Sequence, residues 1–564
     1  MSTASEQDKS PRLLIIAITR MGDLLQASPA IAGFKQEHPN GHITVLCDVT
    51  FEEICKGLPG VDEIYAIQLS VICKAMDRGN DGLVDAYAYF NDRLQELRQK
   101  KFDICVNMAS SSYTALLMNL LDVKDSRGWI SDAEGLRLIT SPWTMLFAAY
   151  VYHGNRDYNS MNIVDLLRCV MGVRAKSERL YYRVPQEAER KAENYFGKVD
   201  PSGTGPLICL QAGASQGKRQ WEPKRFAQLC RLLIEKLDSP IIFTGTKEEK
   251  PVVEAILKSY SHPNMASLAG ETNLTELAAL LKRAGVLITG DTGTMHMSVA
   301  VGTPVVSLFL ASAFCFETGP YSRGNLVLQP QVGCHPCNPN FPCARPDCHE
   351  QLSPELVALV TEHRLKLSDD EISSLQVSGS VADPRQIAIY RTDFDQDGFL
   401  EFVRINGFAE RKGFRESVFV NAQKAYAELW KQEFGAVSRP YRYRGGFVGR
   451  LTAYEQLQKI TDRGARAIES LVELIRNSAS DPHLLGEANR EIVDVEAEIE
   501  NFGLSHPMFG AVTRMFVMER DNIRGDDPLR LAQETKEIYA KTSRRARILE
   551  EMVSDLRRSV VETA

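Results

Sequence analysis

Short apolar runs alternate with amphipathic stretches along the first two thirds of the chain. Residues 12–19, 42–48 and 102–108 are almost continuously apolar, which is typical of parallel strands buried on both faces. After a break rich in Pro and Gly, VDPSGTGP at 199–206, the alternation resumes. Two successive series of strands and helices predict an α/β fold with two Rossmann-like, doubly wound domains. The expected strands of the second series are 207–213, 240–246, 286–292 and 304–310.

The pattern changes after about residue 365. RQIAIYRT (385–392) and FLEFVRI (399–405) flank DFDQDG (393–398), which predicts a β-hairpin with an Asp-Gly turn. The alternative is a calcium loop, because the Asp and Gly residues have its initial spacing. Arg404 stands where that loop needs its bidentate Glu, so the hairpin is favoured.

Apolar residues at helical spacing dominate from about Gly446 onward, as in Ile492, Val495, Ile499 and Phe502. This pattern predicts a helical bundle or helical hairpin. Basic residues in this region are mixed with acidic ones, which favours a solvated surface over a nucleic-acid patch. The basic residues expected on that surface are Arg544, Arg545 and Arg547.

Composition narrows the functional classes. With 66 Lys plus Arg against 73 Asp plus Glu, the 564-residue chain has a net charge of −7, which argues against a nucleic-acid partner. Its first ten residues lack the apolar segment of a signal peptide, and its apolar runs are too short to span a bilayer. Most cysteines stand singly in expected strands or helices, as reduced thiols do. We therefore expect a soluble cytoplasmic protein with at most peripheral membrane contact.

The stretch ITGDTGTMHM (288–297) contains the first candidate site. An expected buried strand ends here in small, hydroxylated and ionisable residues, where a helix begins. Backbone N–H groups at a helix N-terminus bind anions, and glycines allow close approach, so this junction suits a phosphate group. The alternative is a helix cap at Asp291 and a core histidine at 296. The residues concerned are Asp291, Thr292, Gly293, Thr294 and His296.

Residues 264–309, which contain this junction, resemble the donor-binding signature of glycosyltransferase family 9, the bacterial heptosyltransferases. The pattern is D-T-G-x-x-H, an Ala-rich helix, Gly-x-Pro and an apolar strand. Three other segments match in the family's order, namely RMGDLLQASP, QAGASQGKRQWEPKRF and TGTKEE. The resemblance covers about residues 12–365. It implies a GT-B fold and inverting transfer of heptose from an ADP-linked donor, without a catalytic cofactor or metal.

The resemblance also implies roles for individual residues. Asp23 corresponds to the base that takes the proton of the acceptor hydroxyl, although a Gly-Asp pair alone would suggest a helix cap. Ser215 is expected at the departing diphosphate, and Glu249 at the ribose hydroxyls. The family's Lys-x-Trp is replaced by Arg219-Gln220-Trp221, with Lys218 one position earlier, so either cation could contact phosphate.

Combined with this resemblance, the pattern predicts four parts and several partners. The donor is expected to resemble ADP-heptose, and the acceptor to be a glycan, a lipid-linked sugar or a protein. A non-catalytic scaffold that binds nucleotide sugars, or a sugar epimerase of similar fold, is the alternative. The helical extension is expected to bind an acceptor or to form a homo-oligomer. The parts are an acceptor domain (1–198), a donor domain (199–365), a linker with the hairpin (366–445) and the helical extension (446–564).

Four cysteines lie close together in GCHPCNPNFPCARPDCHE. Their spacing, C-x2-C-x5-C-x4-C, and the surrounding prolines suit a structural zinc or iron site in the loop 334–348. Four thiolates would leave no open position for catalysis. His335 or His349 could replace one of the ligands, and free thiols are the alternative. The expected ligands are Cys334, Cys337, Cys343 and Cys348.

Overall fold

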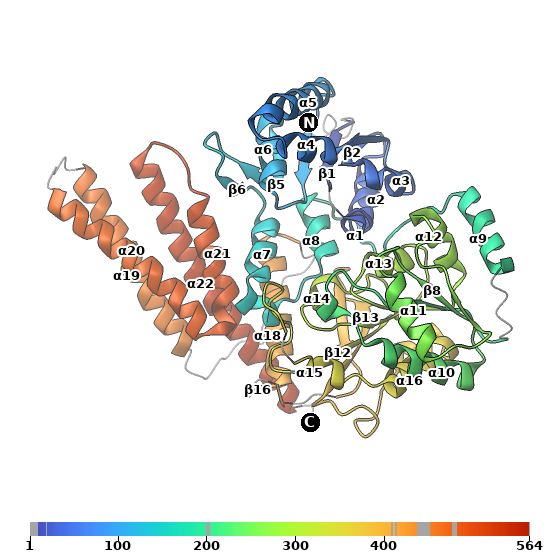
Figure 1. Ribbon diagram of the computed structural model, residues 1–564. Helices are drawn as coiled ribbons and strands as arrows, with labels where there is room; N and C mark the ends of the chain where they lie inside the picture. The colour runs from blue at the N-terminus through green and yellow to red at the C-terminus, as the bar shows by residue number, and fades with distance from the viewer. Residues whose placement is uncertain are drawn as a thin grey trace, which may run out of the picture. The chain divides into compact units, whose positions relative to one another are not determined.

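The structure is a computed structural model, and its contacts divide the chain into two compact units (Figure 1). Unit 1 comprises Met1–Arg137 and Met161–Gly413, and unit 2 comprises Leu138–Ser160 and Phe414–Ala564. The described residues are 10–562 without 19, 199–203, 344, 408–409, 412–413, 437–451 and 477–481. Most of the expected linker at 199–206, and the expected start of the extension at 446, lie outside them.

Unit 1 contains the first of the two expected sheets, shown in blue and cyan in Figure 1. Its order is β3-β2-β1-β4-β5-β6, and strands β1 to β5 pair in parallel. The order reverses between β1 and β4, and ligands bind at such a point in open α/β sheets. The strands are β1 (Arg12–Ile16), β2 (His42–Asp48), β3 (Glu63–Ile67), β4 (Ile104–Asn107), β5 (Asp125–Ser131) and β6 (Arg137–Ile139).

Helices cover this first sheet as its apolar strands require. Leu14, Ile16 and Leu46 are fully or almost fully buried in one core cluster, together with Leu97. Asn162 begins α8 by accepting a hydrogen bond from the N–H of Val164, as an N-cap does. The helices are α1 (Met21–Gln26), α2 (Ser28–Glu37), α3 (Glu52–Lys56), α4 (Leu69–Met76), α5 (Asn80–Gln99), α6 (Ser112–Leu121) and α8 (Ile163–Val170).

The second sheet, green to yellow in Figure 1, has the order β14-β13-β12-β11-β10-β7-β8-β9. Its order reverses between β7 and β10, which pair in parallel. The hairpin is confirmed, because β13 and β14 pair antiparallel and extend this sheet. The strands are β7 (Ile208–Gln211), β8 (Ile241–Thr244), β9 (Met265–Ser267), β10 (Val286–Gly290), β11 (Val305–Leu308), β12 (Leu326–Pro330), β13 (Ile387–Phe394) and β14 (Leu400–Arg404).

Helices also cover the second sheet. Asn273 and Glu276 form a reciprocal capping box at the start of α12, as their spacing predicts. The helices are α9 (Gln186–Lys198), α10 (Pro223–Leu237), α11 (Lys250–Ser259), α12 (Leu274–Arg283), α13 (Gly293–Ala300), α14 (Cys315–Thr318), α15 (Asp347–Glu350), α16 (Pro354–Lys366) and α17 (Asp369–Ser374).

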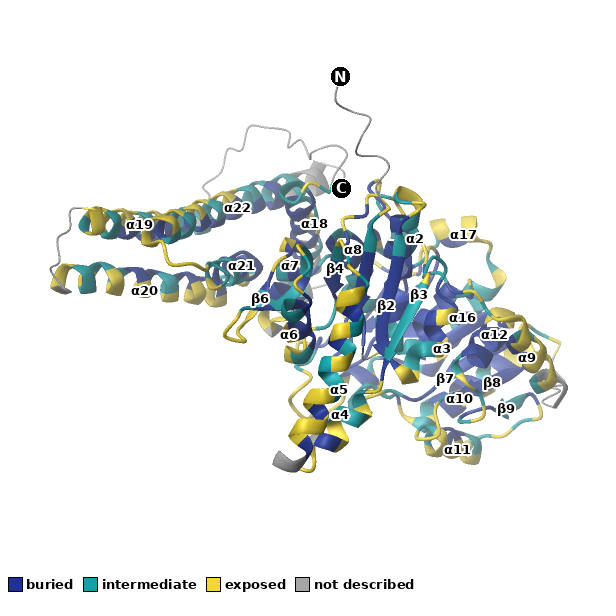
Figure 2. Ribbon diagram, turned by 90° about the horizontal axis from the view of Figure 1, so that it is seen from above, coloured by how far each residue is buried: buried dark blue, intermediate teal, exposed yellow. Residues whose placement is uncertain are grey.

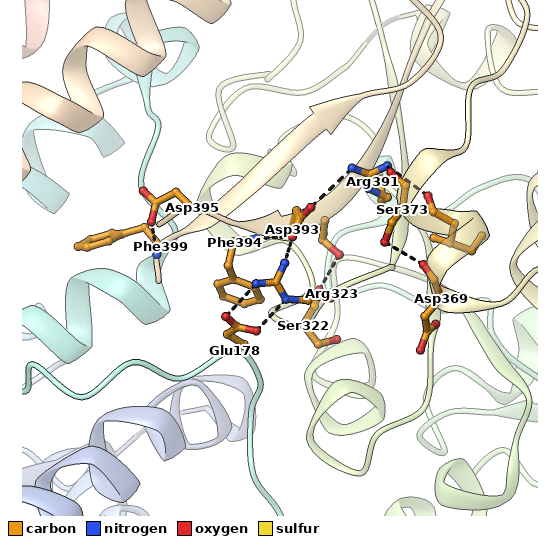
Figure 3. A network of polar contacts seen from close by, with 12 residues as sticks. Glu178, Ser322, Arg323, Asp369, Ser373, Arg391, Asp393, Phe394, Asp395 and Phe399 are labelled. Atoms are coloured by element: carbon orange, nitrogen blue, oxygen red, sulfur yellow. Dashed lines mark hydrogen bonds and ion pairs between the residues drawn. The ribbon is translucent and has the colours of Figure 1, made fainter. Parts of the chain in front are cut away.

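Polar contacts fasten the hairpin to the segment that leaves the first sheet. Arg323 pairs with Glu178 and with Asp393 of β13 (Figure 3). Asp395 accepts hydrogen bonds from the N–H groups of Asp397 and Phe399, which closes the turn. Fully buried Asp165 of α8 accepts hydrogen bonds from the Tyr321 hydroxyl and from the N–H of Leu400, the first residue of β14.

Unit 2 is helical and is built from two distant segments. In the first segment, α7 (Pro142–Val151) carries Tyr150, whose hydroxyl accepts a hydrogen bond from the indole N–H of Trp430. The backbone of Ile139 exchanges two hydrogen bonds with the side chain of Asn522, 383 residues away. The other helices are α18 (Glu416–Glu433), α19 (Thr452–Arg476), α20 (Pro482–Ser505), α21 (Gly510–Asp521) and α22 (Pro528–Glu562).

Buried and exposed positions alternate along α19, α20 and α22, in agreement with the predicted helical spacing (Figure 2). The prediction of a solvated surface is wrong for Arg545, whose side chain is only 2% exposed. Arg545 donates to both carboxylate oxygens of Glu519 and also pairs with Glu433, which compensates the cost of burying its charge. Arg544 and Arg547 are about half exposed, as expected. Over the described part of the chain, every helix is too short or too polar to cross a bilayer.

Candidate functional site

Asp23 lies on α1, which begins five residues after β1 ends at the switch point of the first sheet. Its side chain is half-buried, and no hydrogen bond to its carboxylate is found within the described part of the chain. Burial raises the pKa of Asp23, and the nearby Arg20 guanidinium opposes that rise. A carboxylate that is poorly solvated and holds no partner is suited to accept a proton.

The predicted cluster from Asp291 to His296 spans the end of β10 and the start of α13. Thr292 is the N-cap residue, and its hydroxyl hydrogen-bonds to that of Thr289 at 3.0 Å. Thr294 and His296 are buried in the first turn. The junction therefore presents backbone N–H groups and hydroxyls at the switch point of the second sheet, where an anion can bind.

Helices α1 and α13 contact each other at these two strand ends. A Cβ atom on Gly293 would lie 2.4 Å from the Met21 methyl, so any larger residue there would require the Met21 side chain to move. Across the same contact, a Cβ atom on Gly22 would lie 3.3 Å from Cδ2 of the His296 ring. The residue that precedes Asp23 thus touches the helix that begins at Gly293.

The structure separates the roles of the two cations after β7. Arg219 pairs with Asp291 at 3.2 Å and donates from Nε to the Ser312 hydroxyl at 2.8 Å. Lys218 instead donates from Nζ to three backbone carbonyls of the cysteine-rich loop, at 2.9–3.0 Å. The Arg219 guanidinium therefore lies at the end of β10, whereas the Lys218 ammonium is hydrogen-bonded to the cysteine-rich loop. The carbonyls belong to Asn338, Pro339 and Phe341.

Glu249 lies at the start of α11, between the ends of β7 and β8. Its Oε2 accepts hydrogen bonds from Nε2 of Gln211, at 2.9 Å, and from the N–H of Thr246, at 2.8 Å. A Cβ atom on Gly213 would lie 2.1 Å from Oε1, so glycine lets the carboxylate approach this loop. Ser215 follows on the same loop and is exposed. The side chain of Glu249 is thus fixed at the strand ends and does not project freely.

The four cysteines of the loop 334–348 differ in exposure. Cys334 and Cys343 are exposed, Cys337 is partly buried, Cys348 is buried, and none forms a disulfide. Burial, and then the neighbouring thiols, raise the pKa of Cys337 to about 11. Burial, followed by smaller contributions from Cys334 and Cys343, also raises the pKa of Cys348. No group of three cysteine, histidine or carboxylate ligand atoms within 4.8 Å of one another is found in this loop, Ala344 aside, since that residue is not described.

Two histidines of the loop have structural partners. The ring Nε2 of His349 lies 2.9 Å from the carbonyl oxygen of Lys218, and that of His335 lies 3.1 Å from the carbonyl oxygen of Phe309. Together with the Lys218 ammonium, these contacts attach the loop to the residues that follow β7 and β11. A displacement of the loop would therefore also move Lys218, which follows β7.

Comparison with known proteins shows similarity to one family over the middle of the chain. Residues 92–341 match the family model "Glycosyltransferase family 9 (heptosyltransferase)". The chain contains a glycosyltransferase family 9 domain. The match identifies this domain as a glycosyltransferase domain, and the two Rossmann-like sheets agree with the GT-B type of fold expected from the sequence. The matched range includes the Asp291–His296 cluster, Arg219 and Glu249, whereas Asp23 precedes it.

Curated relatives extend the similarity. The chain is 25% identical over 301 residues to lipopolysaccharide heptosyltransferase 3 of Escherichia coli, covering 52% of this chain and 82% of the relative. It is 23% identical over 335 residues to lipopolysaccharide heptosyltransferase 2 of Salmonella typhimurium, covering 57% and 89%. A solved family 9 glycosyl transferase from Veillonella parvula aligns with 64% of this chain and 98% of its own, at 19% identity and a TM-score of 0.49.

One buried residue beside this candidate site is not predicted from the sequence. Gln26 of α1 is 3% exposed, and its Nε2 lies 3.2 Å from Nε2 of His296. Its position three residues after Asp23 places both on neighbouring parts of one helical surface, which is the signal that could have identified it. Gln26 is thus a polar link between the helix of Asp23 and the helix of His296.

Proposed function

We propose that the protein is an inverting glycosyltransferase that moves heptose from an ADP-heptose-like donor to an acceptor hydroxyl. The observation that carries this proposal is the contact between α1 and α13, which brings the helix of Asp23 to the helix that begins at Gly293. Inversion requires a base on the sugar face opposite the leaving group. A base and an anion site on two facing helices meet that requirement.

In the proposed reaction the acceptor oxygen attacks the anomeric carbon while Asp23 takes the hydroxyl proton. The bond from the anomeric carbon to the diphosphate oxygen breaks, and its electron pair leaves with ADP. Negative charge then grows on the diphosphate, at the N-terminus of α13 and beside Arg219. The Thr292 and Thr294 hydroxyls add donors there. Neutralisation by these groups needs no divalent cation and no other catalytic cofactor.

Specificity for the nucleotide is proposed to come from Glu249. Its carboxylate accepts hydrogen bonds, and the two ribose hydroxyls can donate to it. The bonds from Gln211 and Thr246 hold this carboxylate in place before a ligand arrives, which lowers the entropic cost of binding. Ser215, on the exposed loop after β7, is proposed as a further donor to the diphosphate.

The direct test incubates purified protein with a panel of nucleotide sugars and candidate acceptors and follows the products by mass spectrometry. Release of ADP together with a heptose-sized increase in acceptor mass is the expected result. Calorimetry should detect ADP binding, and ADP should raise the melting temperature through linkage. Absence of nucleotide binding at millimolar ADP would contradict the proposal. Binding without turnover against every acceptor would instead identify a nucleotide-sugar-binding scaffold.

We also propose that the loop 334–348 holds one structural zinc or iron through its four cysteines. Two observations support the fit: the thiols raise one another's pKa, and a cation would reverse that effect. The metal would stabilise the loop and take no part in the reaction of Asp23. Elemental analysis of protein purified without added metal should find about one zinc or iron per chain. Four freely titrating thiols and no metal would show that the loop works without one.

The acceptor side is proposed to involve unit 2. A cavity of about 100 Å³ opens between η2 (His153–Tyr158), α20 and α21 and is lined by Tyr152, Asn155 and Arg514, among others. The Arg514 guanidinium lies 5.3 Å from the centre of the Tyr152 ring. We propose that unit 2 binds a glycan, lipid-linked or protein acceptor, or a second copy of the chain, in the cytoplasm. Arg514→Met should weaken acceptor binding or assembly while leaving ADP binding unchanged.

A further inference from the structure

In the hydrogen bond between Gln26 and His296, the donor and the acceptor can be identified. Both residues are at least 95% buried, so water does not readily replace either one as the hydrogen-bond partner of the other. The Gln26 amide presents its NH2 group, which can only donate, to Nε2 of His296 at 3.2 Å. Nε2 must therefore accept, and the proton of the neutral imidazole must sit on Nδ1. Burial lowers the pKa of His296 to about 4, which keeps the ring neutral near pH 7.

The other nitrogen of the ring, Nδ1, lacks a hydrogen-bond partner in the described part of the chain. Cδ2 and Nε2 form one edge of the imidazole, and this edge faces Gly22 and Gln26 of α1. Nδ1 is bonded to neither of these atoms and lies on the far side of the ring, away from α1. Within the described part of the chain, Nδ1 is buried without a hydrogen-bond partner. An N–H left unpaired in this way is costly unless a ligand accepts from it.

We infer that Gln26 is a positioning residue that fixes the Nδ1–H tautomer of His296, so that this N–H donates to an oxygen of the donor diphosphate. The inference rests on the proposed function and adds to it the state of one group. Gln26 touches no reacting atom and acts only through His296. Because Gln26 and Asp23 share α1, the same hydrogen bond also sets the separation between the base and the helix that holds the diphosphate.

The first test reads the ring directly and requires no turnover. Nitrogen-15 NMR of histidine-labelled protein should show His296 neutral from pH 5 to 8, with Nδ1 protonated and Nε2 bare. The signal is assigned by its loss in His296→Gln. Gln26→Glu replaces the donor with an acceptor and should move the proton to Nε2. A wild-type ring protonated on Nε2, or a spectrum unchanged in Gln26→Glu, would overturn the inference.

The second test uses Gln26→Met, which keeps the size of the side chain and removes its hydrogen bond. It should lower kcat about tenfold and leave the KM for the nucleotide sugar within twofold, because the lost contact acts on the departing charge. Equal kcat for Gln26→Met and wild type would also overturn the inference. If Gln26→Glu does not fold, the wild-type spectrum and Gln26→Met decide. A protein with the expected ring state but no transferase activity would contradict the proposed function alone.

Discussion

The ends of β1 and β10 each lie beside the switch point of their sheet but are built differently. At the end of β10, Asp291 is paired with Arg219, and Thr292 is hydrogen-bonded to Thr289. At the end of β1, the Asp23 carboxylate has no such partner in the described part of the chain, and burial raises its pKa. The side chains at the first strand end are therefore held by polar contacts, while the other strand end carries an unengaged carboxylate, the proposed base.

This difference agrees with the separate tasks proposed for the diphosphate site and for the general base. A site that stabilises a departing diphosphate works best when its dipoles need no rearrangement during the reaction. A general base must change its protonation state, and strong hydrogen bonds to its carboxylate would oppose that change. Asp48 at the end of β2 illustrates the contrast, because three hydrogen bonds lower its pKa.

Replacement of the base tests the comparison most severely. Asp23→Asn should lower turnover by about 10²–10⁴-fold, because general base catalysis is worth that much, and leave ADP affinity within a few fold. Steady-state kinetics and calorimetry provide the two values. Asp48→Asn is the matched control, because it changes a carboxylate on the same sheet and should leave turnover nearly unchanged. Near-native turnover of Asp23→Asn would make this residue a structural one.

Replacement of each cation by Met should have the next largest effect, on the affinity for ADP. Arg219→Met should weaken ADP binding by about 10–100-fold, the value of one or two charge-assisted hydrogen bonds. Lys218→Met removes an equal charge one position away and should change ADP affinity by less than about threefold, because its ammonium is bound to loop carbonyls. Calorimetry with ADP measures both. The reverse order of effects would assign the phosphate contact to Lys218.

A smaller loss is expected at the ribose. Glu249→Gln keeps the shape of the side chain but replaces one acceptor oxygen by a donor, so affinity for ADP should fall about two- to tenfold. Glu248→Gln, at the exposed neighbouring position, is the control and should bind ADP like the wild type. Equal affinities for both variants would remove Glu249 from the nucleotide site.

The dependence on pH should also differ between the two strand ends. Asp23 acts as a base only when deprotonated, and its raised pKa moves the acid limb of kcat above that of an ordinary aspartate. His296 stays neutral above its pKa of about 4, so ADP affinity should remain flat over that limb. Parallel measurements of kcat and ADP affinity from pH 5 to 8 test this. A common limb in both would place the titrating group in the nucleotide site.

The sequence predicts those features that depend on neighbouring residues. Apolar runs identify strands such as β1 and β10, and the spacing of Asn273 and Glu276 identifies the capping box. Features that depend on distant residues are not predictable in this way. The partner of Gln26 lies 270 positions along the chain, and the carbonyls bound by Lys218 lie about 120 positions away. Arg545 was misplaced for the same reason, because its acidic partners lie on α18 and α21.

The two-segment construction of unit 2 has a consequence for synthesis of the protein on the ribosome. Leu138–Ser160 emerges early, but the side chain that bonds Ile139 belongs to Asn522, 383 residues later. During that interval Trp143 and Tyr150, which are buried in the finished protein, lack the rings of Phe434 and Trp430 that contact them there. Contacts between residues so far apart in the sequence slow folding, and apolar surface stays exposed until they form. Unit 2 can therefore complete its core only after its C-terminal segment has been synthesised.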